Sequence, residues 1–254
     1  MIGRLAFSLA LLVLTGSANA ENPAEHPADC RTAEVQPERN FALPQAAHAI
    51  AAKKLNVLVV GAGSSLLPGA NGNMNAYPAR LQQALQAKLK GVEVKVATDV
   101  KSKRSAAEMV KAMVPALTAV KPALVVWQTG TVDAMQAVEP DQFSQALDKG
   151  INIARSAGAD VVFINPQYSP RTESMIALGT YAENMRWVAL QQEVPLFDRF
   201  SIMKVWADLG TFDLNSATKK LDMAERVHDC IGRLLADLVI ESAKSSAPPA
   251  EVGR

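Results

Sequence analysis

The sequence predicts an α/β protein: a three-layer α/β/α sandwich around a five-stranded parallel sheet. Short, continuous apolar runs of strand length alternate along the chain with segments whose apolar residues recur every three or four positions. Such continuous runs are typical of strands that helices cover on both faces. Because strand and helix alternate regularly, the strands should lie parallel, with helices on both faces of the sheet.

The five strands are expected at apolar runs. The first, Leu55 to Val60, is the most continuous, and the loop after it, 61–75, holds four glycines and three asparagines. Val92, Val94 and Val96 mark a second strand, and shorter apolar runs predict the others at 124–127, 161–164 and 195–197.

Helices are expected between these strands. The first begins near Ala76, and Ser105 with Glu108 has the capping-box spacing that opens the next one. Thr172 is expected to cap a later helix, and the final amphipathic helix should begin just after His228. The apolar stripes of these helices are Leu81, Leu85 and Leu89; Met109, Met113 and Leu117; Phe143, Leu147 and Ile151; Met185 and Val188; and Ile231, Leu234, Leu235 and Leu238.

The first 20 residues have the pattern of a signal peptide. Arg4 precedes an apolar run that is too short for a membrane span, and Ala18-Asn19-Ala20 supplies the small residues of a cleavage site. The remaining 234 residues should be exported, to a bacterial periplasm or outside the cell, without stable membrane insertion. The expected divisions are a signal peptide over 1–20, an extended arm over 21–50, one domain over 51–244 and a disordered tail over 245–254.

Charge and cysteine content narrow the function classes. Without Arg4, 25 basic residues balance 25 acidic ones, which argues against a general nucleic-acid binder. Cys30 and Cys230 are the only cysteines, and in an oxidising compartment such a pair predicts a disulfide; two unrelated buried thiols are the alternative. The cysteines and three scattered histidines lack metal-ligand spacing, so we expect no metal and no cofactor.

Ser65 and His228 are the main candidates for a catalytic pair. Ligands of parallel α/β sheets bind beyond the carboxyl ends of the strands, and the loop that holds Ser65 should lie there. A serine hydroxyl needs an adjacent base, and the chain has only three histidines. The alternatives are a serine in a tight turn and a histidine that merely packs or caps; Ser64 is a rival nucleophile.

Three segments resemble the blocks of SGNH (GDSL-type) hydrolases, in the same order. Gly63-Ser64-Ser65, followed by Gly69 and a helix, is similar to the first block, Gly-x-Ser. Gly130-Thr131-Val132-Asp133 is similar to Gly-x-Asn-Asp, and Glu225-Arg226-Val227-His228 stands in place of Asp-x-x-His. The resemblance covers most of residues 55–240 and implies a flavodoxin-like strand order.

The resemblance also implies the roles of the residues. Ser65 would be the nucleophile, with its backbone N–H as one oxyanion donor, and His228 would be the base. Glu225 would orient the imidazole, with Asp222 and Asp229 as rivals.

The sequence departs from the family at two oxyanion donors. Val132 replaces the asparagine, and the family's block-two glycine falls near Ser102 or Lys103. Losing one such donor typically costs about 10²–10³ in rate. Lys103 and Thr131 are the candidate substitutes, and without them the activity would be reduced or altered.

A polar rim is expected around the site. Asp133 retains the acid of the third block, in a role that can be purely structural. Gln167, Tyr168 and Arg171 follow the fourth strand and would position substrate. The run Lys101 to Arg104, together with Arg171, would favour an anionic substrate if it is more than a solvated loop.

The leading functional hypothesis is an exported serine ester hydrolase acting on small acyl esters or O-acetylated polysaccharide. An acyltransferase would use the same Ser/His pair, with a sugar hydroxyl in place of water. The third hypothesis is a catalytically lapsed carbohydrate-binding or assembly protein, motivated by Val132 and the basic second block.

Overall fold

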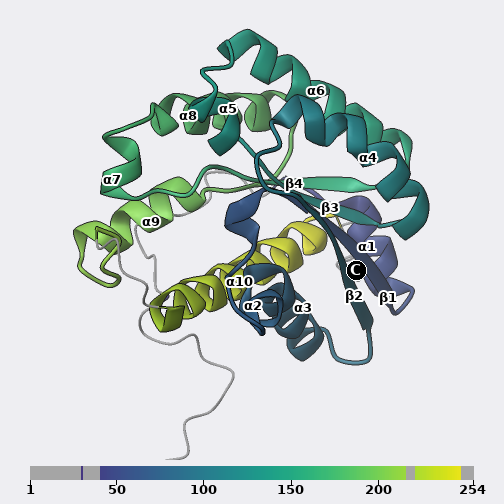
Figure 1. Ribbon diagram of the computed structural model, residues 1–254. Coiled ribbons are helices and arrows are strands. Elements are labelled where there is room, and N and C mark those ends of the chain that lie inside the picture. The colour runs from purple at the N-terminus through teal and green to yellow at the C-terminus, as the bar shows by residue number, and fades with distance from the viewer. Residues whose placement is uncertain (1–29, 31–40, 216–220, 247–254) are drawn as a thin grey trace, which may run out of the picture.

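A five-stranded parallel sheet forms the centre of the molecule. The computed structural model describes residue 30 and residues 41–215 and 221–246 (Figure 1). All four strand pairings are parallel, and the order is β2-β1-β3-β4-β5, which confirms the predicted flavodoxin-like arrangement. The strands are β1 (Lys54–Gly61), β2 (Glu93–Val100), β3 (Leu124–Gln128), β4 (Asp160–Ile164) and β5 (Leu196–Phe197).

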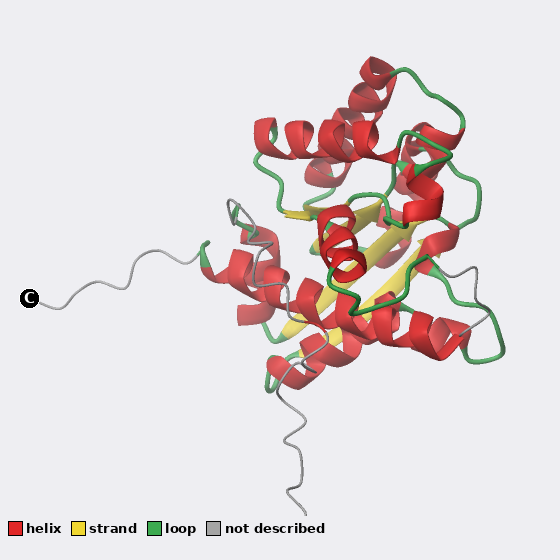
Figure 2. Cartoon of the chain, turned by 90° about the vertical axis from the view of Figure 1, so that its left-hand side faces the viewer, coloured by secondary structure: helices red, strands yellow, loops and turns green. Residues whose placement is uncertain are grey.

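Helices cover both faces of the sheet, as Figure 1 and Figure 2 show from two directions. One layer holds α1 (Pro44–Ala51), α3 (Tyr77–Lys88), α9 (Arg199–Asp208) and α10 (Leu221–Lys244); the other holds α4 (Ala106–Val120), α5 (Thr131–Met135), α6 (Pro140–Ser156) and α8 (Leu178–Gln191). Single turns occupy the loops after β1 and β4: η2 (Gly63–Ser65), α2 (Gly72–Asn75) and α7 (Pro170–Glu173).

The alternation of side chains along β1 divides the core into two halves. Val57 and Val59 join the cluster beneath α3 and α10, whereas Leu58 and Val60 join the one beneath α4 and α6. All four are buried, which explains why this strand is a continuous apolar run.

A close helix–sheet contact shapes the second half of the core. Trp127 of β3 packs directly against Gly150 of α6, where an added Cβ would lie 2.2 Å from the indole ring. Glycine at this position lets α6 approach the sheet.

Three sequence predictions about the elements are wrong. Residues 44–51, mostly in the predicted extended arm, form α1, which begins with Pro44 in its first turn and packs on the core through Ala46. Thr172 caps no long helix: Ser169 caps the single turn α7, and α8 begins only at Leu178. His228 lies inside α10 rather than before it, because that helix already begins at Leu221.

One further local prediction is confirmed, and two concern residues that the structure does not describe. The capping box of α4 is present, with Ser105 and Glu108 bonded in both directions. The predicted signal peptide and most of the predicted tail lie outside the described residues. Among the helices that the structure describes, none combines the length and apolar character needed to cross a membrane.

Candidate active site

Polar side chains from four elements meet at the carboxyl edge of the sheet. β1 ends at Gly61 and leads into η2, which carries Ser64 and Ser65. β3 ends at Gln128, and β5 leads through Asp198 into α9, whose first residue is Arg199. Tyr77 enters from the start of α3. Hydrogen bonds join these side chains into one cluster.

The Ser65 side chain points inward. It has no exposed surface, and its Oγ lies over Gly61, where an added Cβ would come within 2.2 Å of it. Ser65 Oγ is 2.7 Å from Gln128 Oε1 and 3.2 Å from the Tyr77 hydroxyl. Gly61 therefore creates the space in which the serine reaches the end of β3.

The contact with Arg199 fixes how the Gln128 amide is oriented. A guanidinium can only donate, so the amide atom 3.2 Å from Arg199 Nη1 is the oxygen. The Gln128 amide nitrogen then donates to Ser64 Oγ at 2.6 Å. Since Ser65 donates its proton to the same Gln128 oxygen, the Tyr77 hydroxyl is the donor in its contact with Ser65.

Arg199 is a buried cation with neutral contacts. Its side-chain hydrogen bonds go to Gln128 Oε1 and, at 3.5 Å, to Ser64 Oγ, and its buried Nε has no partner among the described residues. Within the described part of the chain, no carboxylate forms an ion pair with it. Burial lowers the pKa of Arg199 to about 10, so the side chain keeps its charge at neutral pH.

A second polar network places Arg199. Asp198 caps α9 by accepting from the backbone N–H of Ser201, and it also accepts from Asn165 Nδ2 and from Arg186. Burial opposes the charge of Asp198, but the bonds from Arg186 and Asn165 hold its pKa below the usual value. The start of α9 is thus anchored to the end of β4.

His228 reaches the same region from α10. Its Nδ1 accepts the backbone N–H of Tyr77, the first residue of α3, at 2.9 Å. One turn further along α10, Gly232 lies against the backbone of Arg80 and Leu81; a Cβ there would come within 2.5–2.8 Å of that helix. This close approach of the two helices seats the imidazole against Tyr77.

These contacts specify a neutral imidazole. Burial, reinforced by the charge of Arg199, lowers the pKa of His228 to about 3. Because Nδ1 accepts a hydrogen bond, the single proton of the neutral ring is on Nε2. His228 is therefore arranged at neutral pH as a hydrogen-bond donor.

The structure brings Ser65 and His228 into one cluster through Tyr77. Ser65 meets the tyrosine hydroxyl and His228 meets its backbone N–H, with the two rings 5.9 Å apart. No direct hydrogen bond joins Ser65 to His228 among the described contacts. Burial raises the pKa of Tyr77 to about 12, so its hydroxyl stays protonated.

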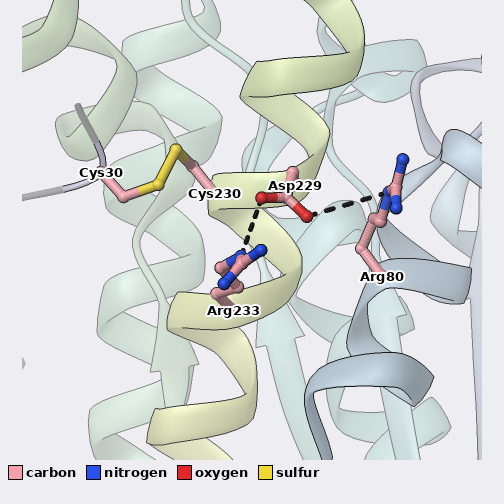
Figure 3. The surroundings of a disulfide bond; sticks show 5 residues. All are labelled: Cys30, Arg80, Asp229, Cys230 and Arg233. Carbon is pink, nitrogen blue, oxygen red and sulfur yellow. Dashed lines mark hydrogen bonds and ion pairs between the residues drawn. A yellow bond between two sulfur atoms is a disulfide. The ribbon is translucent and has the colours of Figure 1, made fainter. Parts of the chain in front are cut away.

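The carboxylates predicted to orient His228 are engaged elsewhere. Glu225 accepts from Asn75 Nδ2 at 2.8 Å, and Asn75 in turn accepts from Arg80. Asp229 pairs with Arg233 and Arg80, as Figure 3 shows. The described contacts connect neither acid to the imidazole; the backbone of Tyr77 orients the ring instead.

The predicted oxyanion donors are also not gathered into a hole. The N–H of Ser65 donates to Ala62 O at 2.9 Å, inside η2. Lys103 is exposed and lies in a loop at φ 63°, and within the part of the chain that the structure describes the buried Thr131 hydroxyl has no partner. Val132, which replaces the family's asparagine, is partly buried against the core.

Asp133 has a structural position. Its buried carboxylate accepts from the N–H of Ala106, the first residue of α4, and from the Thr129 hydroxyl. Burial raises the pKa of Asp133. The acid thus ties α5 to the start of α4.

The other predicted rim residues, Gln167, Tyr168 and Arg171, follow β4. Gln167 and Tyr168 are partly buried, and the Tyr168 ring packs edge-on against Phe200 at 5.3 Å. Arg171 is exposed in α7. Phe200 is the second residue of α9, directly after Arg199, so this contact places the loop beside the start of α9.

The predicted disulfide is present. A disulfide joins Cys30 to Cys230 (Figure 3). Their Cα atoms are 5.2 Å apart, and both residues are buried. The bond fixes Cys30 to α10 two residues beyond His228. Among the described residues, no cluster of three or more His, Cys, Asp or Glu side chains could hold a metal ion.

Sequence reasoning missed Gln128, Tyr77 and Arg199 as members of the site. Gln128 could have been noticed, because it is a polar residue directly ending an apolar run. Arg199 follows the short fifth strand, whose exit loop should also lie at the carboxyl edge. Tyr77 carries no such signal, since an aromatic residue in the first turn of a helix is usually core.

The comparisons agree with this architecture. A model of the Non-GDSL lipase-like family matches residues 29–245. The fold is also that of TesA (TM-score 0.54, 24% identity, covering 72% of this chain and 99% of that one). No curated protein sequence matches.

Two further solved structures share the fold. One is a lipase/acylhydrolase from Enterococcus faecalis, with a TM-score of 0.57, 17% identity, and coverage of 78% of this chain and 100% of that one. The other is a catalytic mutant of Axe2, an acetylxylan esterase from Geobacillus stearothermophilus, with a TM-score of 0.53, 13% identity, and coverage of 74% and 94%. The predicted fold and the resemblance to SGNH hydrolases are therefore confirmed.

Proposed function

Since the chain belongs to the Non-GDSL lipase-like family, we propose that it is an exported serine ester hydrolase. The family and the fold together support an ester-hydrolysing enzyme. The substrates proposed are small acyl esters, and in particular O-acetylated carbohydrate, the substrate class named for the acetylxylan esterase that shares the fold. The disulfide supports export, because such bonds persist in oxidising compartments.

The observation that carries the proposal is the meeting of Ser65 and His228 at the carboxyl edge of the sheet. They are 163 residues apart in the sequence, yet both hydrogen-bond to Tyr77. In the proposed reaction, Ser65 Oγ attacks the acyl carbon, and His228 takes the serine proton and returns it to the leaving alcohol. Water then attacks the acyl-enzyme, and the acid is released as Ser65 recovers its proton.

The described contacts represent a resting state of this reaction. Ser65 must release Gln128 Oε1 before its oxygen can reach a substrate, because the side chain has no exposed surface. His228 must also present an unprotonated nitrogen, which at rest faces the N–H of Tyr77. Substrate binding is therefore proposed to move η2 and the imidazole together.

Kinetics on an activated acetyl ester test the proposal. Ser65→Ala and His228→Ala should each remove most of the activity, and the double variant should be scarcely worse, because residues that act as a unit do not lose activity additively. Ser144→Ala, on α6, is the control and should keep wild-type kcat. Full activity in Ser65→Ala would exclude Ser65 as the nucleophile.

One observation favours a second candidate, a catalytically lapsed carbohydrate-binding or assembly protein. Ser65 is fully buried, and its proton is already donated to Gln128. Under this alternative the protein would bind acetylated polysaccharide without releasing acetate. Measuring acetate release and polysaccharide binding on the same sample separates the two: the hydrolase releases acetate, whereas the lapsed protein only binds. An acyltransferase would instead transfer the acetyl group to an added sugar.

A further inference from the structure

The Ser64 hydroxyl lies at the end of a chain of hydrogen bonds whose protons can all be assigned. Tyr77 donates to Ser65, Ser65 to Gln128 Oε1, and Gln128 Nε2 to Ser64 Oγ. Arg199 donates to the same Gln128 oxygen and also approaches Ser64 Oγ. Bonds aligned in this way polarise one another, so the hydroxyl at the end becomes a stronger donor.

The proton of Ser64 is left for an external acceptor. Its oxygen faces Gln128 Nε2 at 2.6 Å and Arg199 Nη2 at 3.5 Å, and both of these groups can only donate. No described residue accepts from Ser64. Unlike Ser65, Ser64 is partly exposed, so its proton can be directed toward a bound molecule.

The charge behind Ser64 favours a negative acceptor. Arg199 is fully buried and, within the described residues, has only neutral partners, so its charge is not cancelled locally. In a site of low dielectric constant, a fixed positive charge of this kind stabilises an anion much more than it would in water.

We propose that the Ser64 hydroxyl donates a hydrogen bond to an anionic tetrahedral oxygen at this site, with Gln128 positioning the hydroxyl and Arg199 supplying the charge. During ester hydrolysis that atom is the oxyanion of the tetrahedral intermediate, so this part rests on the proposed function. The Ser64 hydroxyl thereby takes the place of the side-chain N–H donor that the family's asparagine supplies, since valine at position 132 has no such donor. No proton is transferred: Ser64 and Arg199 both stay protonated.

Binding of inorganic phosphate, a tetrahedral anion, tests the site without requiring activity. Titration calorimetry on the full-length disulfide-bonded protein should show binding that Ser64→Ala weakens about 10-fold or more, the size expected for a charge-assisted hydrogen bond. Ser144→Ala, another partly buried serine, is the matched control and should bind as wild type.

Gln128→Glu tests the role of the charge. The new carboxylate keeps an oxygen for Ser65 and Arg199, cancels the guanidinium charge and removes the donor to Ser64. Phosphate binding should be lost while the thermal midpoint is unchanged or higher. A residue with only a structural role would leave phosphate affinity unaltered in the folded variant.

Turnover supplies the second readout. Ser64→Ala should lower kcat on an activated acetyl ester by about 10²-fold with little change in KM, as for other oxyanion donors. Unchanged phosphate affinity and unchanged kcat in Ser64→Ala would overturn the proposal while leaving the hydrolase intact. A wild type that binds phosphate through Ser64 but hydrolyses no ester would overturn the hydrolase and keep the anion site.

Discussion

Protonation of His228 should make the protein lose stability in mild acid. The imidazole is buried beside Arg199, and its pKa falls from 6.5 to about 3 on folding. Above pH 6.5 neither the folded nor the unfolded chain protonates this residue. Between pH 6.5 and about 3, only the unfolded chain binds the proton, so the free energy of unfolding falls as the pH falls.

The size of the effect follows from the width of that window. Each unit of pKa difference is worth about 1.4 kcal/mol, so going from pH 7 to pH 4.5 should cost about 2–3 kcal/mol through His228 alone. Other groups also change stability in acid, since burial raises the pKa of Asp133 and of Asp160. The contribution of His228 must therefore be measured as a difference between variants.

His228→Asn is the matched variant, because its Oδ1 can accept the N–H of Tyr77 as Nδ1 does and its side chain does not titrate. Urea unfolding at pH 7 and pH 4.5 should show the wild type losing about 2–3 kcal/mol more than the variant. An equal loss in both proteins would refute the neutral, buried imidazole, and with it the proton assigned to Nε2.

The remaining predictions concern the disulfide, the oxyanion and the helix contact. Cys30→Ser with Cys230→Ser should lower the free energy of unfolding by roughly 3–5 kcal/mol, and thiol titration of the unreduced protein should find no free thiol; two thiols would contradict the bond. Val132→Asn should change kcat little in wild type but recover activity in Ser64→Ala; no recovery would show that residue 132 does not face the oxyanion. Gly232→Ala should cost about 1–3 kcal/mol by pushing α10 off α3, and an unchanged thermal midpoint would contradict that contact.

The sheet was predictable because local patterns decide it. The central strands β1, β3 and β4 are mostly apolar and almost fully buried, as expected for strands that helices cover on both faces, whereas β2 alternates apolar and polar residues. The start of α10 was harder to place. Residues 221–228 include several charged side chains, and this part of α10 bonds to its neighbours through Glu225, which accepts from Asn75 of α2, and His228, which accepts from Tyr77 of α3.

The site was predictable in part. Motif order placed Ser65 and His228 at the carboxyl edge of the sheet, and the structure has both of them there, beside Tyr77. Their hydrogen-bond partners were not predictable, since these depend on side-chain direction. Glu225 has the spacing of an orienting acid but faces Asn75. Arg199 follows the predicted fifth strand, but its sequence position does not tell that its side chain turns inward to Gln128.

The identity of the nucleophile is tested most directly by covalent labelling with a fluorophosphonate, followed by peptide mass spectrometry. We expect one modified residue, Ser65, with no labelling of Ser65→Ala and slower labelling of Ser64→Ala, whose oxyanion donor is missing. Modification of Ser64 in place of Ser65, or a folded wild-type protein that takes up no label, would contradict the assignment of Ser65 as the nucleophile of a serine ester hydrolase.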